Sequence, residues 1–255
     1  MDLTRNFGAA AQDYAKHRAG FPDSFYERLL AFGIGLPGQQ VVDIGTGTGV
    51  LGRGFARRGC RVIGIDPDER LLAQARLLDQ EAGVTIEYRT GVAEAMPAAD
   101  RSTDVITAGT CWHWFNGPVA AREVKRIGNP GAYVVIAMFS WLPLPGNVVA
   151  ATERLIEQHN PAWKFGGGNG FYLECIEHLQ GEGIGNIETF SYDVQVPYTQ
   201  ESWRGRIRAS AGVGASLSTE GVQAFDADLA LLLQQSFNTD VLQVHHRLLT
   251  VIARL

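Results

Sequence analysis

Short apolar runs alternate with amphipathic stretches over residues 41–139. Aliphatic and β-branched residues gather in five runs, at 41–44, 61–66, 84–89, 104–108 and 133–139. The segments between them repeat apolar residues every three or four positions, as in Leu71, Leu72, Ala75 and Leu78. Strands that alternate with helices in this way predict a doubly wound, parallel sheet. Ligands of such sheets bind beyond the carboxyl ends of the strands, so the residues that follow each strand are the candidates for function.

The pattern changes on both sides of this region. Residues 1–32 are predicted to be helical, and the second helix starts at Pro22 with Phe25, Leu29 and Leu30 facing inward. Proline and glycine interrupt residues 141–185, with one amphipathic helix near 150–158, and residues 199–240 return to helical spacing. Residues 186–198 and 245–255 have the character of strands. We therefore expect one α/β domain, a Rossmann-like, doubly wound sheet of seven mostly parallel strands with a helical cap.

The first strand runs directly into a group of alternating glycines. Val41 to Ile44 is followed by Gly45, Gly47 and Gly49, and helical spacing begins immediately after them. Glycine permits the positive φ angles of a tight turn and lets a ligand approach bare backbone, and the N–H groups of a helix N-terminus point towards such a ligand. This stretch predicts a strand, a turn and a helix that bind a nucleotide-like ligand.

Two classes of nucleotide fit the turn. Gly47, Gly49 and Gly52 have the G-x-G-x-x-G spacing of dinucleotide-binding proteins, and Asp66 ends the next strand at about the distance that this fingerprint requires. Asp43 favours the other class, because a carboxylate beside the turn would repel a pyrophosphate in a partly dehydrated cleft. S-adenosylmethionine carries a sulfonium, an ammonium and no phosphate, so the same carboxylate attracts it. Asp66 suits both ligands, since each presents a ribose diol.

These motifs resemble those of the class I S-adenosylmethionine-dependent methyltransferases. The resemblance rests on VVDIGTGTG, GIDPD, GVAEAMP and the strand 104–108 followed by CWHWF, and it is strongest up to residue 139. It points to the small-molecule, type 11-like branch, and so implies S-adenosylmethionine as the cofactor and direct methyl displacement. The implied organisation is a helical lid (1–32), a cofactor-binding core (33–140), a substrate-side cap (141–185 and 199–240) and two closing strands (186–198 and 245–255).

The resemblance also implies which residues contact the cofactor. Arg18 would meet the carboxylate of its methionine part, Asp66 would hold the ribose hydroxyls, and the loop 90–97 would reach the adenine. Small residues at the end of the fourth strand would let the chain pass close to the methionine. The full expected set is Tyr14, Arg18, Asp43, Gly45, Thr46, Gly47, Gly49, Asp66, Pro67, Ala93, Glu94, Ala108 and Gly109.

Aromatic residues predict the acceptor side. All five tryptophans lie after residue 111, which indicates a dry, aromatic-lined pocket for a planar or apolar acceptor, such as an aromatic or heterocyclic metabolite. Packing within the cap explains the same distribution equally well. The residues expected to line the pocket are Trp112, Trp114, Trp141 and Phe165.

His113 is the candidate catalytic residue. A histidine near the sulfonium could take a proton from a hydroxyl, amine or thiol acceptor. The alternative is a structural histidine held between two tryptophans. Methyl transfer often needs no strong base, because the sulfonium is already activated and an in-line approach supplies much of the rate.

Three rival functions remain open on the sequence. Arg204, Arg206 and Arg208 follow Trp203 and could bind an acceptor carboxylate, which would make the substrate a small carboxylic acid. The glycine spacing by itself would allow an NAD(P)-dependent oxidoreductase. A protein that binds the cofactor without turnover is the third.

Composition limits the partners. The chain of 255 residues has a net charge of −5, which gives no electrostatic footprint for nucleic acid. Three widely spaced cysteines and scattered histidines predict neither a disulfide framework nor a metal site. No hydrophobic signal region is seen, and the longest apolar run, 132–139, is too short to span a bilayer, so we expect a cytoplasmic protein that acts on a small molecule without membrane contact.

Overall fold

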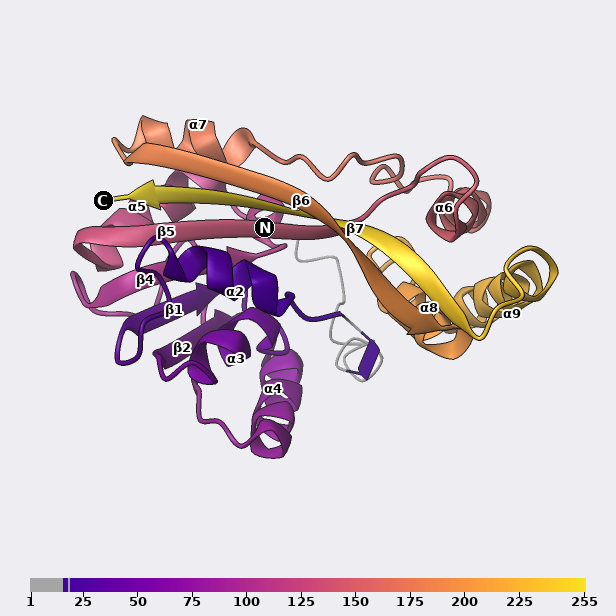
Figure 1. Ribbon diagram of the computed structural model, residues 1–255, viewed down its shortest axis with the longest axis horizontal. Coiled ribbons are helices and arrows are strands. Elements are labelled where there is room, and N and C mark those ends of the chain that lie inside the picture. The colour runs from indigo at the N-terminus through magenta and orange to yellow at the C-terminus, as the bar shows by residue number, and fades with distance from the viewer. Residues whose placement is uncertain (1–15, 18) are drawn as a thin grey trace.

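A single seven-stranded sheet forms the centre of the protein in the computed structural model, which describes residues 16–17 and 19–255 (Figure 1). Its strands are β1 (Gln40–Ile44), β2 (Arg61–Asp66), β3 (Glu87–Thr90), β4 (Thr103–Gly109), β5 (Gly128–Trp141), β6 (Gly185–Thr199) and β7 (Val241–Arg254). They follow the order β3-β2-β1-β4-β5-β7-β6. β7 alone runs in the direction opposite to the other six strands. The predicted Rossmann-like, mostly parallel, seven-stranded sheet is confirmed.

Helices cover both faces of this sheet. They are α2 (Asp23–Leu30), α3 (Val50–Ala56), α4 (Glu69–Ala82), α5 (Gly117–Ile127), α6 (Val148–His159), α7 (Glu174–Gly181), α8 (Gln200–Arg208), α9 (Thr219–Ser236) and the 3₁₀ turn η2 (Trp112–Trp114). Successive residues of β1 point to opposite faces. Val41 packs in the core beneath α2 and α3, and Val42 packs in the core beneath α5 and α7. No helix within the described ranges is both long and apolar enough to cross a bilayer.

A third hydrophobic core lies apart from the two that cover the faces of the sheet. The far ends of β6 and β7 twist away from the main body and carry α8 and α9, while α6 lies close by (Figure 1). Trp203, Phe225, Leu229 and Val244 are fully buried in this core. Because β5, β6 and β7 each have 14 or 15 residues, they are long enough to reach from the main sheet to this third core. The name cap is used below for α6, α8, α9 and the loops beside them.

The structure corrects three details of the sequence prediction. The fifth strand begins at Gly128 and not at residue 133, because Gly128 pairs with Thr103 before a register shift between β4 and β5. The helical stretch 199–240 is two helices, since the Ser218 side chain accepts from the Gly221 amide and caps a new helix. Leu30 is 40% exposed, because it falls beside the buried stripe of α2.

Gly54 in α3 shows how closely α2 packs on the core. Tyr26 lies against it and donates a hydrogen bond to the Leu51 carbonyl at 3.1 Å, and a Cβ at position 54 would overlap the Tyr26 ring and hydroxyl. We expect Gly54→Ala to destabilise the protein by about 2 kcal/mol, although alanine favours a helix by about 1 kcal/mol over glycine. The midpoint of thermal unfolding should fall by roughly 4–8 °C. Gly181→Ala in α7, where a Cβ meets nothing within 4 Å, is the matched control and should not lower it.

Candidate functional site

A cavity of about 870 Å³ lies at the carboxyl ends of the parallel strands, between the core and the cap. The core contributes Gly45 and Gly47 after β1, Asp66 at the end of β2, and Gly109 at the end of β4. The cap contributes residues of α6, of the segment 163–172 and of the segment 206–212. This position is where an open α/β sheet binds its ligands, and the volume is within the range of small-molecule and cofactor sites.

The glycine turn is shaped by backbone conformation and by close contacts. Gly45 and Gly47 have φ angles of 63° and 56°, and both line the cavity. A Cβ on Gly45 would lie 2.9 Å from the Cys111 sulfur. Gly49 begins α3 with φ 76°, and its missing side chain leaves room for Tyr88 instead of facing the cavity. Glycine at positions 45 and 47 therefore forms part of the cavity lining, and glycine at position 49 lets Tyr88 pack against the start of α3.

Amide groups of this turn are bonded within the chain. The Thr46 amide donates to the Ile65 carbonyl at 3.0 Å, and the Gly49 amide donates to the Thr46 carbonyl at 2.9 Å. The Gly47 amide donates to Asp66 at 2.9 Å, and the Gly52 amide donates to Asp43 at 3.2 Å. The expectation that the N–H groups here point at a ligand is wrong for these four, because the two aspartates, the neighbouring strand β2 and the Thr46 carbonyl of the turn itself accept from them.

Asp43 holds the turn from behind. Its carboxylate is 1% exposed and accepts from the Thr46 hydroxyl at 2.6 Å and the Thr107 hydroxyl at 2.7 Å, besides the Gly52 amide. Burial is the main cause that raises the pKa of Asp43 to about 6. Asp43 and Thr46 do not line the large cavity; both border a small hollow of about 20 Å³ next to Gly45. The carboxylate thus ties β1, the turn, α3 and β4 together.

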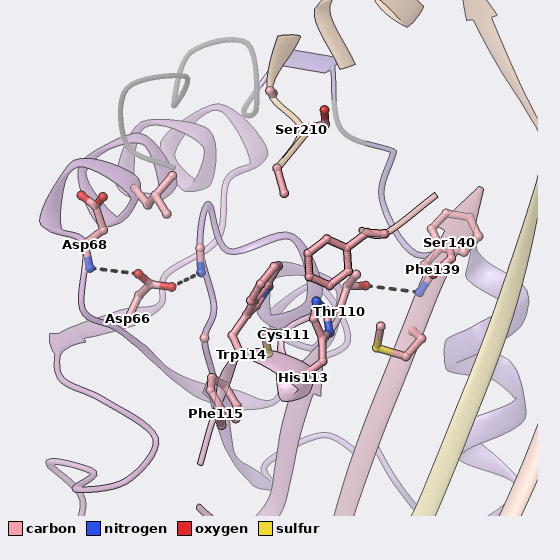
Figure 2. A pocket seen from close by; sticks show the side chains of 18 of the residues that line it. Asp66, Asp68, Thr110, Cys111, His113, Trp114, Phe115, Phe139, Ser140 and Ser210 are labelled. Carbon is pink, nitrogen blue, oxygen red and sulfur yellow. Dashed lines mark hydrogen bonds between the residues drawn. The ribbon is translucent and has the colours of Figure 1, made fainter. Parts of the chain in front are cut away.

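Asp66 lies in the wall of the cavity (Figure 2). One carboxylate oxygen accepts from the Gly47 amide and the other from the Asp68 amide, both at 2.9 Å. Burial raises the pKa of Asp66. Each oxygen keeps a lone pair for a further donor, which is what two ribose hydroxyls require. Pro67 lines the cavity beside Asp66, as expected.

The other residues of the expected cofactor set fall in different places. Ala93 and Gly109 line the cavity, whereas Ala108 is buried in β4 behind it. Glu94 does not line the cavity, and its carboxylate accepts from the Asn116 amide at 2.7 Å at the start of α5. Tyr14 and Arg18 lie outside the described residues.

The expected acceptor residues are brought together with one exception. His113, Trp114, Trp141 and Phe165 line the cavity, and Figure 2 shows His113 and Trp114 side by side across the site from Asp66. The His113 ring stacks on Tyr172 with centroids 5.8 Å apart. Trp112 turns the other way: it is 4% exposed, packs with α5 and α7, and donates to His178 Nδ1 at 3.3 Å.

Sequence reasoning missed several lining residues. Glu153 of α6 is 5% exposed and lines the cap side of the cavity, together with Ser210. A glutamate between Val149 and Ile156 on the apolar side of a predicted helix was a usable signal. Thr110 gave no signal: it has φ 58°, rare for a β-branched residue, and accepts from the Phe139 amide at 3.2 Å.

The three arginines of α8 do not act together. Arg204 and Arg208 both pair with Asp226 and with Glu201. Only Arg206 lines the cavity, and its guanidinium lies over the Trp141 ring at 4.7 Å from the centroid. Among the described residues, no group of three or more His, Cys, Asp or Glu side chains is placed to hold a metal ion.

Comparison with known proteins agrees with this geometry. The methyltransferase domain family matches residues 42–136. A ubiquinone biosynthesis O-methyltransferase from Stutzerimonas stutzeri is 48% identical over 112 residues, which are 43% of this chain and 48% of that protein. An uncharacterized methyltransferase from Mycobacterium bovis is 30% identical over 130 residues, 51% of this chain and 50% of that protein. The matched part therefore spans about half the length of these curated relatives.

The whole chain also shares its fold with solved structures. A putative type II methyltransferase from Anaeromyxobacter dehalogenans superimposes with a TM-score of 0.62, covering 93% of this chain and 97% of that one at 19% identity. At that identity the likeness shows the fold alone. The matched domain and the curated relatives confirm the resemblance read from the motifs for this part of the chain: residues 42–136 form a domain of the methyltransferase family.

Proposed function

We propose that this protein transfers a methyl group from S-adenosylmethionine to a small acceptor with an aromatic or heterocyclic body. The observation that carries the proposal is that one cavity joins the Asp66 wall of the core to an aromatic wall that includes Trp114, Trp141 and Phe165. A cofactor bound at the first wall would lie across the cavity from an acceptor bound at the second. The proposed division of labour is the one expected from the sequence, with a lid at 1–32, a cofactor core at 33–140 and a cap at 141–185 and 199–240.

The residues of the core side fit S-adenosylmethionine better than a dinucleotide. The free lone pairs of Asp66 suit the ribose diol, and Leu71, Val92 and Ala93 supply apolar surface for a purine. The turn amides of Gly47, Gly49 and Gly52 already have acceptors in the chain, so they are not left to bind a pyrophosphate as in dinucleotide-binding turns. These features argue against the rival oxidoreductase.

The chain contributes positioning and, at one point, a proton acceptor. The bound cofactor supplies an activated methyl group on its sulfonium. Gly45 and Gly109 allow close approach of the backbone, and the rings of Trp114 and Phe165 exclude water and orient the acceptor, which is a large part of what such a transfer needs. In this proposal His113 takes the proton that a hydroxyl, amine or thiol acceptor loses, and its position in the cavity lining next to Trp114 supports that role.

Titration calorimetry tests the cofactor assignment. We expect S-adenosylmethionine and S-adenosylhomocysteine to bind with micromolar or lower Kd and NADH not to bind. Binding of NADH alone would reverse the assignment. Formation of S-adenosylhomocysteine with a panel of small aromatic acceptors then separates an enzyme from a protein that only binds the cofactor.

His113 can be tested once an acceptor is in hand. We expect His113→Gln to lower kcat about 100-fold, because a positioned general base contributes at least that factor, and to remove the acidic limb of the pH profile of kcat. Tyr172→Phe, which keeps the ring that stacks on His113, is the control and should leave that limb in place. A near-normal kcat for His113→Gln would contradict the role as a base and would show that His113 only lines the cavity.

A further inference from the structure

We propose that the acceptor carries a basic amine, and that Glu153 with the rings around it binds this amine in its protonated form. The inference rests on the proposed function, since it concerns the acceptor half of the same cavity. It narrows the acceptor from an aromatic or heterocyclic metabolite to one that is also a cation.

Glu153 is a buried carboxylate that lines the cavity, and it forms no ion pair with any residue that the structure describes. One oxygen accepts from Trp141 Nε1 and the other from the Gly167 amide, both at 2.8 Å. Both donors are neutral, and the hydrogen bonds leave each oxygen a second acceptor position. The charge found to act on Glu153 within the described part of the chain is that of Glu157, one turn along α6, and it too is negative.

A carboxylate in this setting favours a positive ligand. Taking an ionised group out of water is costly unless an opposite charge or several hydrogen bonds compensate it. Burial accordingly raises the pKa of Glu153. An ammonium that enters the cavity restores the missing charge and donates to the two open acceptor positions. A carboxylic acid bound beside Glu153 would instead bring a second anion next to the first, so this position disfavours that rival substrate class.

The rings beside Glu153 suit the same ligand. Trp141, Trp163 and Tyr172 all line this part of the cavity. The guanidinium of Arg206 over Trp141 shows that one of these ring faces already binds a cation. Trp163 is held firmly, because a Cβ on either Gly166 or Gly212 would lie 3.0 Å from its ring. Fixed aromatic faces with a carboxylate at their edge recognise an ammonium attached to an apolar body.

Matched ligands that differ only in charge test this site. The probes are 2-phenylethylamine, 2-phenylethanol and phenylacetate, titrated by calorimetry into the protein saturated with S-adenosylhomocysteine. We expect the amine to bind at least 10-fold more tightly than the alcohol, and phenylacetate to bind most weakly. Glu153→Gln should lower the affinity for the amine by about 10- to 100-fold, as expected for a lost charge-assisted hydrogen bond, and leave the alcohol unchanged.

Two controls separate the possible failures. Glu157→Gln removes the neighbouring charge on α6 and should not weaken amine binding, so a local contact is distinguished from a long-range field. The affinity of each variant for S-adenosylhomocysteine reports whether the cofactor half is intact. If the wild type does not bind S-adenosylhomocysteine, the proposed function fails. If it does, but shows no preference for the amine or keeps that preference in Glu153→Gln, the amine site alone is overturned.

Discussion

Replacing Asp43 with alanine should lower the free energy of unfolding by about 3 kcal/mol, the largest stability loss that we expect from a single substitution near the site. The carboxylate joins the Thr46 and Thr107 hydroxyls and the Gly52 amide, and each buried donor left without an acceptor costs about 1–3 kcal/mol. Relief of the buried charge offsets part of that loss. Urea denaturation followed by tryptophan fluorescence measures the change.

Asp43→Asn isolates the charge from the hydrogen bonds. The pKa of Asp43 is raised from 3.8 to about 6 by burial, so the folded state holds this proton more tightly than the unfolded state. Its ionisation therefore costs stability, in full above pH 6, and the cost of about 3 kcal/mol disappears as the pH falls from 6 towards 4. The stability of Asp43→Asn relative to the wild type should be greatest above pH 6 and should decline towards pH 4. A difference that does not change with pH would contradict the raised pKa.

Asp43 also shows what a motif can and cannot reveal. The sequence places a carboxylate beside the glycine turn, and the structure keeps it there. Its direction depends on Thr107, 64 residues away in the sequence and on the neighbouring strand β4. The spacing of residues in the sequence gives no information on that contact. Because Asp43 does not line the large cavity, its expected attraction for a cationic ligand has to act from behind the turn.

The fold was predictable because its signals are local. The strands β1, β2 and β4 coincide with short apolar runs, and Val41 and Val42 of β1 are buried on opposite faces whatever the function. The edge strand β3 is the exception, because Glu87–Thr90 is polar and begins three residues after the predicted start at 84. The aromatic segment was only half predictable. Within η2, Trp114 faces the cavity and Trp112 faces the core under α5 and α7, and consecutive aromatic residues do not indicate which of them turns inward. Glu153 was readable, as a charge on the buried side of an amphipathic helix.

Asp66→Ala should weaken S-adenosylhomocysteine binding about 100-fold, or roughly 2.7 kcal/mol. Both carboxylate oxygens lie in the cavity wall with a lone pair each to spare, and two charge-assisted hydrogen bonds to a ribose diol account for a loss of this size. Asp66→Asn keeps the shape and one carbonyl acceptor, so we expect it to lose about 10-fold. Calorimetry gives both values, and an unchanged affinity in the alanine variant would remove Asp66 from the cofactor site.

A ligand that lacks one ribose hydroxyl distinguishes direct contact from a disturbed turn. Asp66 also holds the Gly47 and Asp68 amides, so the alanine variant could lose affinity through the backbone alone. In a double-mutant cycle with the 2′-deoxy analogue of S-adenosylhomocysteine, the wild type should bind the analogue about 10-fold more weakly than the parent ligand. Asp66→Ala should bind the analogue and the parent ligand with the same affinity. Such coupling arises only if the Asp66 carboxylate accepts from that hydroxyl. If the two losses of affinity simply add, Asp66 supports the turn in the way that Asp43 does, and other groups of the cavity bind the ribose.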